Sequence, residues 1–177
     1  EAVGRDALKK VTERYWQAEK VSAADPVRVG EAFAHINDDL VAGTEREARA
    51  GAKIVLWPES QAMVLQRDAE ALVDRVKNVA TQHDVYVNMA FALYTGQDDR
   101  IRNLAILVTP QGRLVWTYDK AHPTPMEPMK PGPADVPVAD SPYGRLANVI
   151  CYDADFPDLM RQAAQKGADV VLVPAND

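Results

Sequence analysis

Three ionisable side chains each stand directly after an apolar segment of strand-like sequence. They are Glu59, Lys120 and Cys151, the only cysteine of the chain. If their strands are neighbours running the same way, the crevice at the carboxyl ends would bring acid, ammonium and thiol together. A thiol needs a base, which a desolvated carboxylate can supply, and a charged lysine can stabilise a thiolate and then an oxyanion. The three residues together predict nucleophilic chemistry at a thiol.

Cys151 lies where the apolar run 146–150 gives way to a predicted helix. The free N–H groups and dipole of a helix N-terminus favour a thiolate there. Taken singly, each residue also has an ordinary interpretation: a small buried thiol, a solvated strand-end lysine and a helix-capping glutamate. If the functional interpretation holds, Cys151 should react unusually fast with alkylating agents, and Glu59→Gln should slow that reaction.

The composition is that of an ordinary globular domain and excludes some functions. The chain has 177 residues, 47% of them hydrophobic, and a net charge of −6, enough for one sizeable core. No basic stripe is available for phosphates, which argues against nucleic acid as a partner. The single cysteine forms no internal disulfide, and the three histidines are scattered. We therefore expect neither a metal nor a cofactor.

The order of predicted elements indicates an α/β domain. Helical spacing predicts helices at about 6–20, 67–82 and 156–166, and one ending at Arg49 with Asn37 or Asp38 as its cap. A short strand is predicted at 27–29, and longer ones at 53–58, 85–93, 103–109, 114–118, 145–152 and 169–174. This alternation predicts layered helices and sheets. The proline-rich segment 119–135 is a loop long enough to suggest a functional role.

One internal echo bears on the architecture. Residues 45–59 and 160–174 both read as a helix, then Gly-Ala, then an apolar strand followed by proline. Such units recur in any α/β protein, so coincidence is one interpretation. The other is that the chain has two related halves that place equivalent strands side by side in one sheet.

Three motifs together resemble a known family. Trp57-Pro58-Glu59-Ser60, the segment Tyr-Asp-Lys-Ala-His-Pro at 118–123, and Val-Ile-Cys-Tyr-Asp-Ala-Asp-Phe-Pro at 149–157 are similar to motifs of the nitrilase superfamily of carbon–nitrogen hydrolases. Its members use a Glu-Lys-Cys triad in this chain order. The resemblance implies a nitrilase-like αββα sandwich over residues 26–177, with residues 1–25 as an N-terminal helix and linker. It also implies a small-molecule amide or acyl donor as substrate, and association as a homodimer.

The resemblance assigns roles to individual residues. Cys151 would attack the carbonyl or nitrile carbon, while Glu59 would accept its proton and return it to the leaving amine. Lys120 would stabilise the oxyanion together with the backbone N–H of Tyr152. Family members often carry a second glutamate in the loop after the lysine, and Glu127 is the matching residue. Ordinary surface charge is the other interpretation of Glu127.

Three functional hypotheses remain open at this point. The first is an enzyme that cleaves an amide-type carbon–nitrogen bond through an acyl-cysteine thioester, located in the cytoplasm. The second is acyl transfer from phospholipid to an amine, because the Trp-Pro-Glu-Ser motif and residues 174–177 also resemble apolipoprotein N-acyltransferases. The full-length parent would then associate with a membrane, with the catalytic domain extracytoplasmic. The third is a non-catalytic fragment, since the chain stops directly after a strand and we expect the sandwich to be truncated at its C-terminus.

Overall fold

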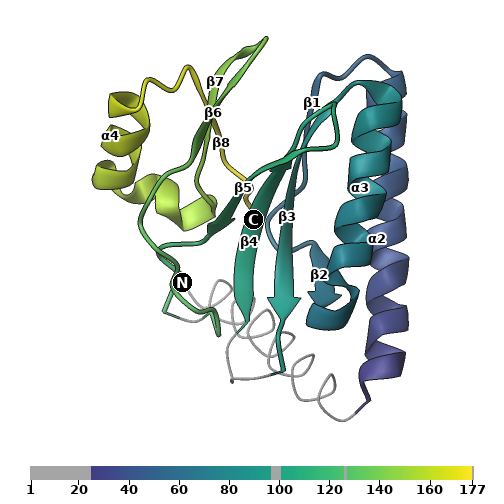
Figure 1. The fold of residues 1–177 in the computed structure, drawn as a ribbon. Helices are drawn as coiled ribbons and strands as arrows, with labels where there is room; N and C mark the ends of the chain where they lie inside the picture. Colours follow the sequence, from purple (N-terminus) through teal and green to yellow (C-terminus); the bar gives the residue numbers. More distant parts are fainter. Residues whose placement is uncertain (1–24, 97–100, 126, 177) are drawn as a thin grey trace, which may run out of the picture.

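The computed structural model describes residues 25–96, 101–125 and 127–176, which form two β-sheets with helices on their outer faces (Figure 1). The helices α2 (Pro26–Arg49) and α3 (Ala69–His83) lie on one side, and α4 (Pro157–Gln165) lies on the other. The predicted αββα layering is therefore confirmed. The predicted helix at 6–20 falls outside the described residues, and the proposed boundary after residue 25 stays a prediction.

The five-stranded sheet is built around a long central strand. Its strands are β1 (Ile54–Leu56), β2 (Ala62–Leu65), β3 (Tyr86–Tyr94), β4 (Arg102–Val108) and β5 (Leu114–Asp119). Both β1 and β2 pair with β3 in parallel, while β4 is antiparallel to β3 and β5 is antiparallel to β4. It follows that β1 and β5 run in the same direction.

The second sheet has three strands in the order β6 (Val138–Ser141), β7 (Gly144–Asn148) and β8 (Val170–Leu172). Here β6 and β7 are antiparallel, and β7 and β8 are parallel. The sequence analysis missed β2 and β6, which are only four residues long. No helix of the described part of the chain is long and apolar enough to cross a membrane.

The helix α2 corrects two predictions. Residues 27–29 are not a strand, because α2 already begins at Pro26, and Asn37 does not cap it. Asp25 caps the helix instead, its side chain accepting a hydrogen bond from the backbone N–H of Arg28 at 3.2 Å. The buried side chains recur every three or four residues, as a helix requires: Val29, Phe33, Asn37, Val41, Thr44 and Ala48. The burial of that stripe outweighs the preference of Val27 and Val29 for a strand.

The echo in the sequence corresponds to a repeated turn. The helices α2 and α4 are each followed, two residues after their last residue, by a glycine with positive φ, 103° at Gly51 and 74° at Gly167. The following alanine donates back into the helix in both cases, Ala52 to Glu47 at 3.0 Å and Ala168 to Ala163 at 3.1 Å. The expected placement in one sheet is wrong, however, because β1 and β8 belong to different sheets.

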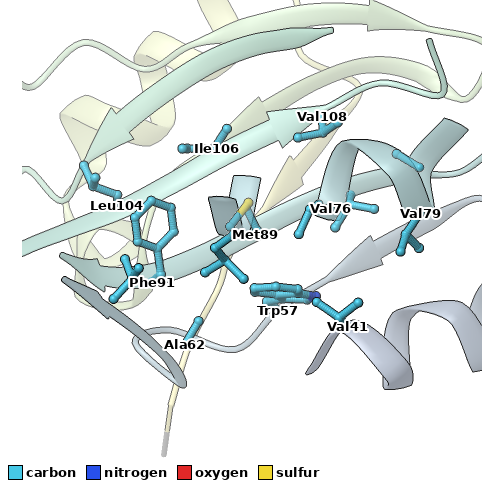
Figure 2. Packing of buried hydrophobic residues seen from close by; sticks show 14 of the residues in the cluster. Val41, Trp57, Ala62, Val76, Val79, Met89, Phe91, Leu104, Ile106 and Val108 are labelled. Atoms are coloured by element: carbon cyan, nitrogen blue, oxygen red, sulfur yellow. The ribbon is translucent and has the colours of Figure 1, made fainter. Parts of the chain in front are cut away.

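The core anchors the segments that lead to the reactive residues. Between the two helices and the first sheet lies a cluster that includes Trp57, Met89, Phe91 and Val108 (Figure 2). Trp57 is 2% exposed, and its ring N–H donates to Thr44 Oγ1 at 2.8 Å. Because Glu59 follows two residues later, this anchoring determines where the carboxylate emerges.

Candidate active site

The three predicted residues converge in a different way from the one expected. Glu59 follows β1 and Lys120 follows β5, but β3 and β4 separate these two strands. Cys151 follows β7, which belongs to the other sheet. The condition considered from the sequence, neighbouring strands in one sheet, is therefore not met. The site forms where strand ends of the two sheets meet, so side chains rather than adjacent backbones bridge the distance.

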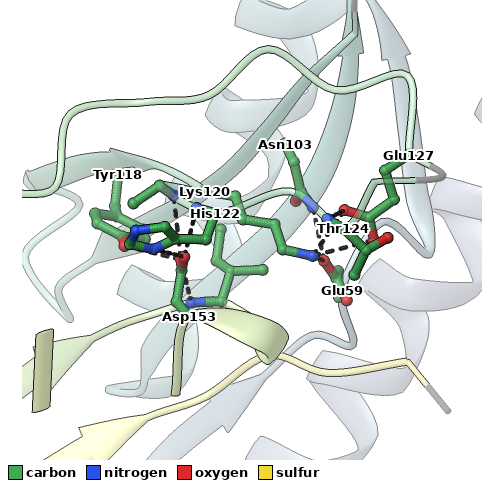
Figure 3. Close-up of polar contacts among 10 residues, drawn as sticks. Glu59, Asn103, Tyr118, Lys120, His122, Thr124, Glu127 and Asp153 are labelled. Carbon is green, nitrogen blue, oxygen red and sulfur yellow. Dashed lines mark hydrogen bonds and ion pairs between the residues drawn. The ribbon is translucent and has the colours of Figure 1, made fainter. Parts of the chain in front are cut away.

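Glu59 is a buried carboxylate with two strong donors on one oxygen. Its side chain is 6% exposed, and Oε1 accepts hydrogen bonds from Lys120 Nζ and Asn103 Nδ2, both at 2.7 Å (Figure 3). The backbone N–H of Glu59 also donates to Ala175 O at 3.4 Å. These contacts hold the carboxylate in one position and keep its charge compensated.

Lys120 is fully buried between two glutamates. Besides Glu59, its Nζ contacts Glu127 Oε2 at 3.0 Å and Oε1 at 3.1 Å (Figure 3). Glu127 is held in turn by the backbone N–H of Thr124, 2.9 Å from Oε2. Burial opposes the charged form of Lys120, but the two carboxylates outweigh it and raise its pKa. The site therefore holds a permanent ammonium, and Glu127 belongs to it rather than to ordinary surface charge.

Cys151 opens a short 3-10 helix, Cys151–Asp155, and has a left-handed backbone with φ of 45°. Its backbone N–H donates to Pro174 O at 2.8 Å, which ties the turn to the segment after β8. A non-glycine residue in this region is strained, and such strain clusters at functional sites. The turn therefore presents the thiol in a conformation that the surrounding structure enforces.

The pKa of the Cys151 thiol is raised rather than lowered, contrary to the expectation from its place before a helix. Burial is the largest cause that raises the pKa of the thiol, and the charge and hydrogen bond of Glu59 raise it further. The charge of Lys120 lowers it in part. The helix α4 begins only at Pro157, so its N-terminus is not the dominant influence. Glu59 thus faces a thiol whose proton it can accept.

Tyr152 was predicted to supply a backbone N–H to the oxyanion, and that role stays a prediction. Its side chain packs edge-on against Phe156, with ring centroids 5.2 Å apart. The ring of His122 stacks on the same Phe156 at 3.7 Å. These aromatic rings lie on both segments that carry the reactive residues, so they help to hold the segments together.

Asp153 was not predicted, and it connects the segment of the cysteine to that of the lysine. It is fully buried. Its carboxylate accepts hydrogen bonds from the backbone N–H groups of Ile150, Ala121 and His122 and from the hydroxyl of Tyr118 (Figure 3). Burial and the neighbouring Asp153 carboxylate raise the pKa of Tyr118, so its hydroxyl remains a donor. The only sequence signal was an acid two residues after the cysteine.

Gly132 allows the loop to approach the backbone of the lysine segment. Its N–H donates to Lys120 O at 2.8 Å, and an added Cβ would lie 2.3 Å from Asp119 Cβ and 2.6 Å from Asp119 O. We expect Gly132→Ala to lower the free energy of unfolding by about 1–3 kcal/mol, measured by urea denaturation, because one segment must move.

Gly43→Ala is the matched control for Gly132→Ala. Gly43 lies inside α2, and the nearest atom to an added Cβ is Arg46 Nη2 at 4.0 Å. There alanine should raise the free energy of unfolding by about 0.5–1 kcal/mol, since it favours the helix. Equal effects of the two variants would show that close approach at Gly132 does not constrain the lysine segment.

An αββα sandwich that buries a carboxylate and an ammonium beside a thiol is typical of hydrolases that act on carbon–nitrogen bonds. Residues 23–177 match the family model for carbon–nitrogen hydrolases, and the chain belongs to this family. The resemblance to apolipoprotein N-acyltransferases is not supported by these matches. The family assignment agrees with the resemblance of the three motifs.

The individual relatives match only part of this chain, and this chain matches only part of each relative. Formamidases of Bacillus thuringiensis (strain Al Hakam) and Bacillus cereus (strain AH820) are 46% identical over 72 residues, which is 40% of this chain and 22% of theirs. An amidase of Nesterenkonia AN1 from the nitrilase superfamily is 24% identical with a TM-score of 0.71, and another amidase structure from Nesterenkonia sp. is 26% identical with a TM-score of 0.68. Each of the two amidase structures matches 81% of this chain, over 59% of its own length. The chain thus spans less than two thirds of these relatives.

Proposed function

We propose that this chain carries the catalytic centre of an enzyme that hydrolyses small amides through an acyl-cysteine thioester. The observation that supports this most directly is the buried ion pair of Glu59 and Lys120, with 2.7 Å between Oε1 and Nζ, beside the thiol of Cys151. A base and a permanent cation next to one nucleophile are what acyl transfer to a thiol needs.

In the first half of the reaction the enzyme becomes acylated. Glu59 accepts the thiol proton as Cys151 Sγ forms a bond to the amide carbon, and the carbonyl electron pair moves onto oxygen. The ammonium of Lys120 and the backbone N–H of Tyr152 stabilise that oxyanion. When the carbonyl re-forms, the carbon–nitrogen bond breaks and the leaving nitrogen takes the proton from Glu59.

In the second half water releases the acid. Glu59 accepts a proton from the water that attacks the thioester carbon, and Lys120 again faces the oxyanion. The carbon–sulfur bond then breaks, the carboxylic acid leaves, and Cys151 regains a proton from Glu59. Glu127 keeps Lys120 in place through both halves, because both of its carboxylate oxygens contact the ammonium, at 3.0 and 3.1 Å.

The relatives support small amides as the substrate class. Curated relatives are named formamidases. In one structure of the Nesterenkonia sp. AN1 amidase, the acetamide moiety of fluoroacetamide is added covalently at the active-site cysteine, and another is in complex with butyramide. Aliphatic amides of one to four carbons are therefore the first compounds to test.

The test is ammonia release from formamide, acetamide and butyramide by the full-length protein, with intact-mass detection of an acyl adduct. Cys151→Ala is the control and should abolish both signals. Folded wild-type protein that gives neither ammonia nor adduct would contradict the proposal. A long-chain acyl adduct formed from phospholipid alone would replace hydrolysis with acyl transfer.

A further inference from the structure

We propose that Asn103 is a positioning residue that occupies Oε1 of Glu59 and thereby reserves Oε2 for the proton of Cys151. Asn103 lies in β4, is 1% exposed, and no motif pointed to it. The inference rests on the proposed function, since it assigns a task to Asn103 within the same site. It concerns how the base is oriented rather than which residue is the base.

The geometry leaves one orientation for the amide. An ionised carboxylate only accepts hydrogen bonds, so the group that Asn103 turns toward Glu59 is its NH₂, at 2.7 Å. Lys120 donates to the same oxygen at the same distance. Two donors on Oε1 fix the plane of the carboxylate and leave Oε2 as the oxygen for a further proton. The backbone carbonyl of Asn103 accepts a hydrogen bond from the backbone N–H of Lys120 at 2.9 Å, so the strand places the amide side chain next to the lysine segment.

The other end of the same amide argues against a purely structural role. Asn103 Oδ1 is buried and has no hydrogen-bond partner among the described residues, and such an unpaired atom costs about 1–3 kcal/mol. The next five residues along β4 are apolar and buried, and an apolar side chain at position 103 would avoid that cost. An amide kept there at a cost to stability is expected where the site needs its N–H donor.

The test compares Asn103→Leu and Asn103→Asp with wild type. Asn103→Leu removes the donor and the unpartnered oxygen at similar volume, so it should unfold in urea at the same or higher concentration. Its kcat/KM for the amide should fall about 10- to 100-fold because the carboxylate is misplaced. The acid limb of the pH profile should move up by about one unit, since a carboxylate that loses a charged hydrogen bond holds its proton more tightly.

Asn103→Asp should move the acid limb further in the same direction, because a second carboxylate then faces Glu59. The other ionisable groups around Glu59 are Lys120, Glu127 and Cys151, and all variants keep them. Coupling among these groups is present in all three proteins. The quantity to compare is therefore the order of their acid limbs along the pH axis: wild type, then Asn103→Leu, then Asn103→Asp.

Asn37→Leu is the matched control. Asn37 is also a buried asparagine whose Oδ1 has no partner in the described part of the chain, but it lies in α2 and donates to Met63 O at 2.9 Å, away from the site. It should leave the pH profile unchanged. Asn103→Leu with unchanged turnover and an unchanged acid limb would overturn the proposal, whatever its stability.

A second readout separates this inference from the proposed function. If wild type hydrolyses no amide, the rate of Cys151 alkylation by iodoacetamide still reports on Glu59. Asn103→Leu should then react more slowly than wild type near neutral pH, because a Glu59 carboxylate that has lost a donor raises the pKa of the Cys151 thiol further. Equal alkylation rates in wild type, Asn103→Leu and Asn37→Leu would overturn the inference without any reference to amide turnover.

Discussion

Replacing Lys120 with methionine is expected to lower kcat/KM for amide hydrolysis by about 10²–10³-fold, because it removes the charge that faces the oxyanion. Methionine keeps much of the length of the side chain, so the loss reports on charge rather than on an empty space. The same change leaves the buried Glu59 and the half-buried Glu127 without their shared cation. Lys120→Met should therefore lower stability as well as activity.

The stability loss has a definite size and pH dependence. Removing one partner of a buried ion pair costs about 3–5 kcal/mol. In wild type the pKa of Lys120 lies above its ordinary value of 10.5, so its contribution is fully present below pH 10.5 and is lost only as the pH rises through the higher folded value. In Lys120→Met the deficit should be largest at neutral pH and shrink on acidification, because protonation of one carboxylate relieves the repulsion.

Urea denaturation between pH 5 and 9 measures this dependence. The matched control is the double variant Lys120→Met/Glu127→Gln, which removes one of the two facing carboxylates. It should regain part of the stability that Lys120→Met loses, but none of the activity. A Lys120→Met protein as stable as wild type at neutral pH would contradict the expected repulsion between Glu59 and Glu127.

Much of the fold could be predicted from local patterns, and the errors have a common cause. The strands at 54–56, 86–94 and 102–108 were recognisable because their apolar runs end at turns. The start of α2 was missed because two valines near its N-terminus favour a strand locally, whereas the buried stripe that contains Phe33 and Val41 extends along most of the helix. Which sheet a strand joins is a long-range property, so the interpretation that placed β1 and β8 side by side in one sheet was wrong.

The candidate site shows the same division between local and long-range information. Glu59, Lys120 and Cys151 stand in recognisable motifs, and the structure places Glu59 and Lys120 in direct contact beside the cysteine. Asn103 and Asp153 have no comparable signal. Asn103 is a single amide in an apolar strand, and its importance arises from a contact to Glu59, 44 residues away in the chain. Such residues emerge only when packing brings distant segments together.

Glu59→Gln is expected to separate two activities that the sequence alone would link. Amide turnover should fall by about 10²–10⁴-fold, because the base that takes the thiol proton and returns it to the leaving nitrogen is gone. Alkylation of Cys151 by iodoacetamide should become faster near neutral pH. Burial raises the pKa of the thiol, and Glu59 raises it further, whereas Lys120 lowers it. Glutamine removes the effect of the Glu59 charge and leaves the effect of Lys120, which lowers the pKa of the thiol.

This expectation reverses the sign that the sequence suggested, since a base was then expected to speed alkylation. Cys151 is the only cysteine, so the rate of mass increase reports on it alone, with Cys151→Ala as background. Glu127→Gln is the matched control, because it makes the same chemical change on the other side of Lys120, and it should alkylate nearly as wild type does. If turnover and alkylation fell together in Glu59→Gln, Glu59 would be needed to form the thiolate itself. The two carboxylates flanking Lys120 would then differ because one ionises the nucleophile and the other only holds the cation.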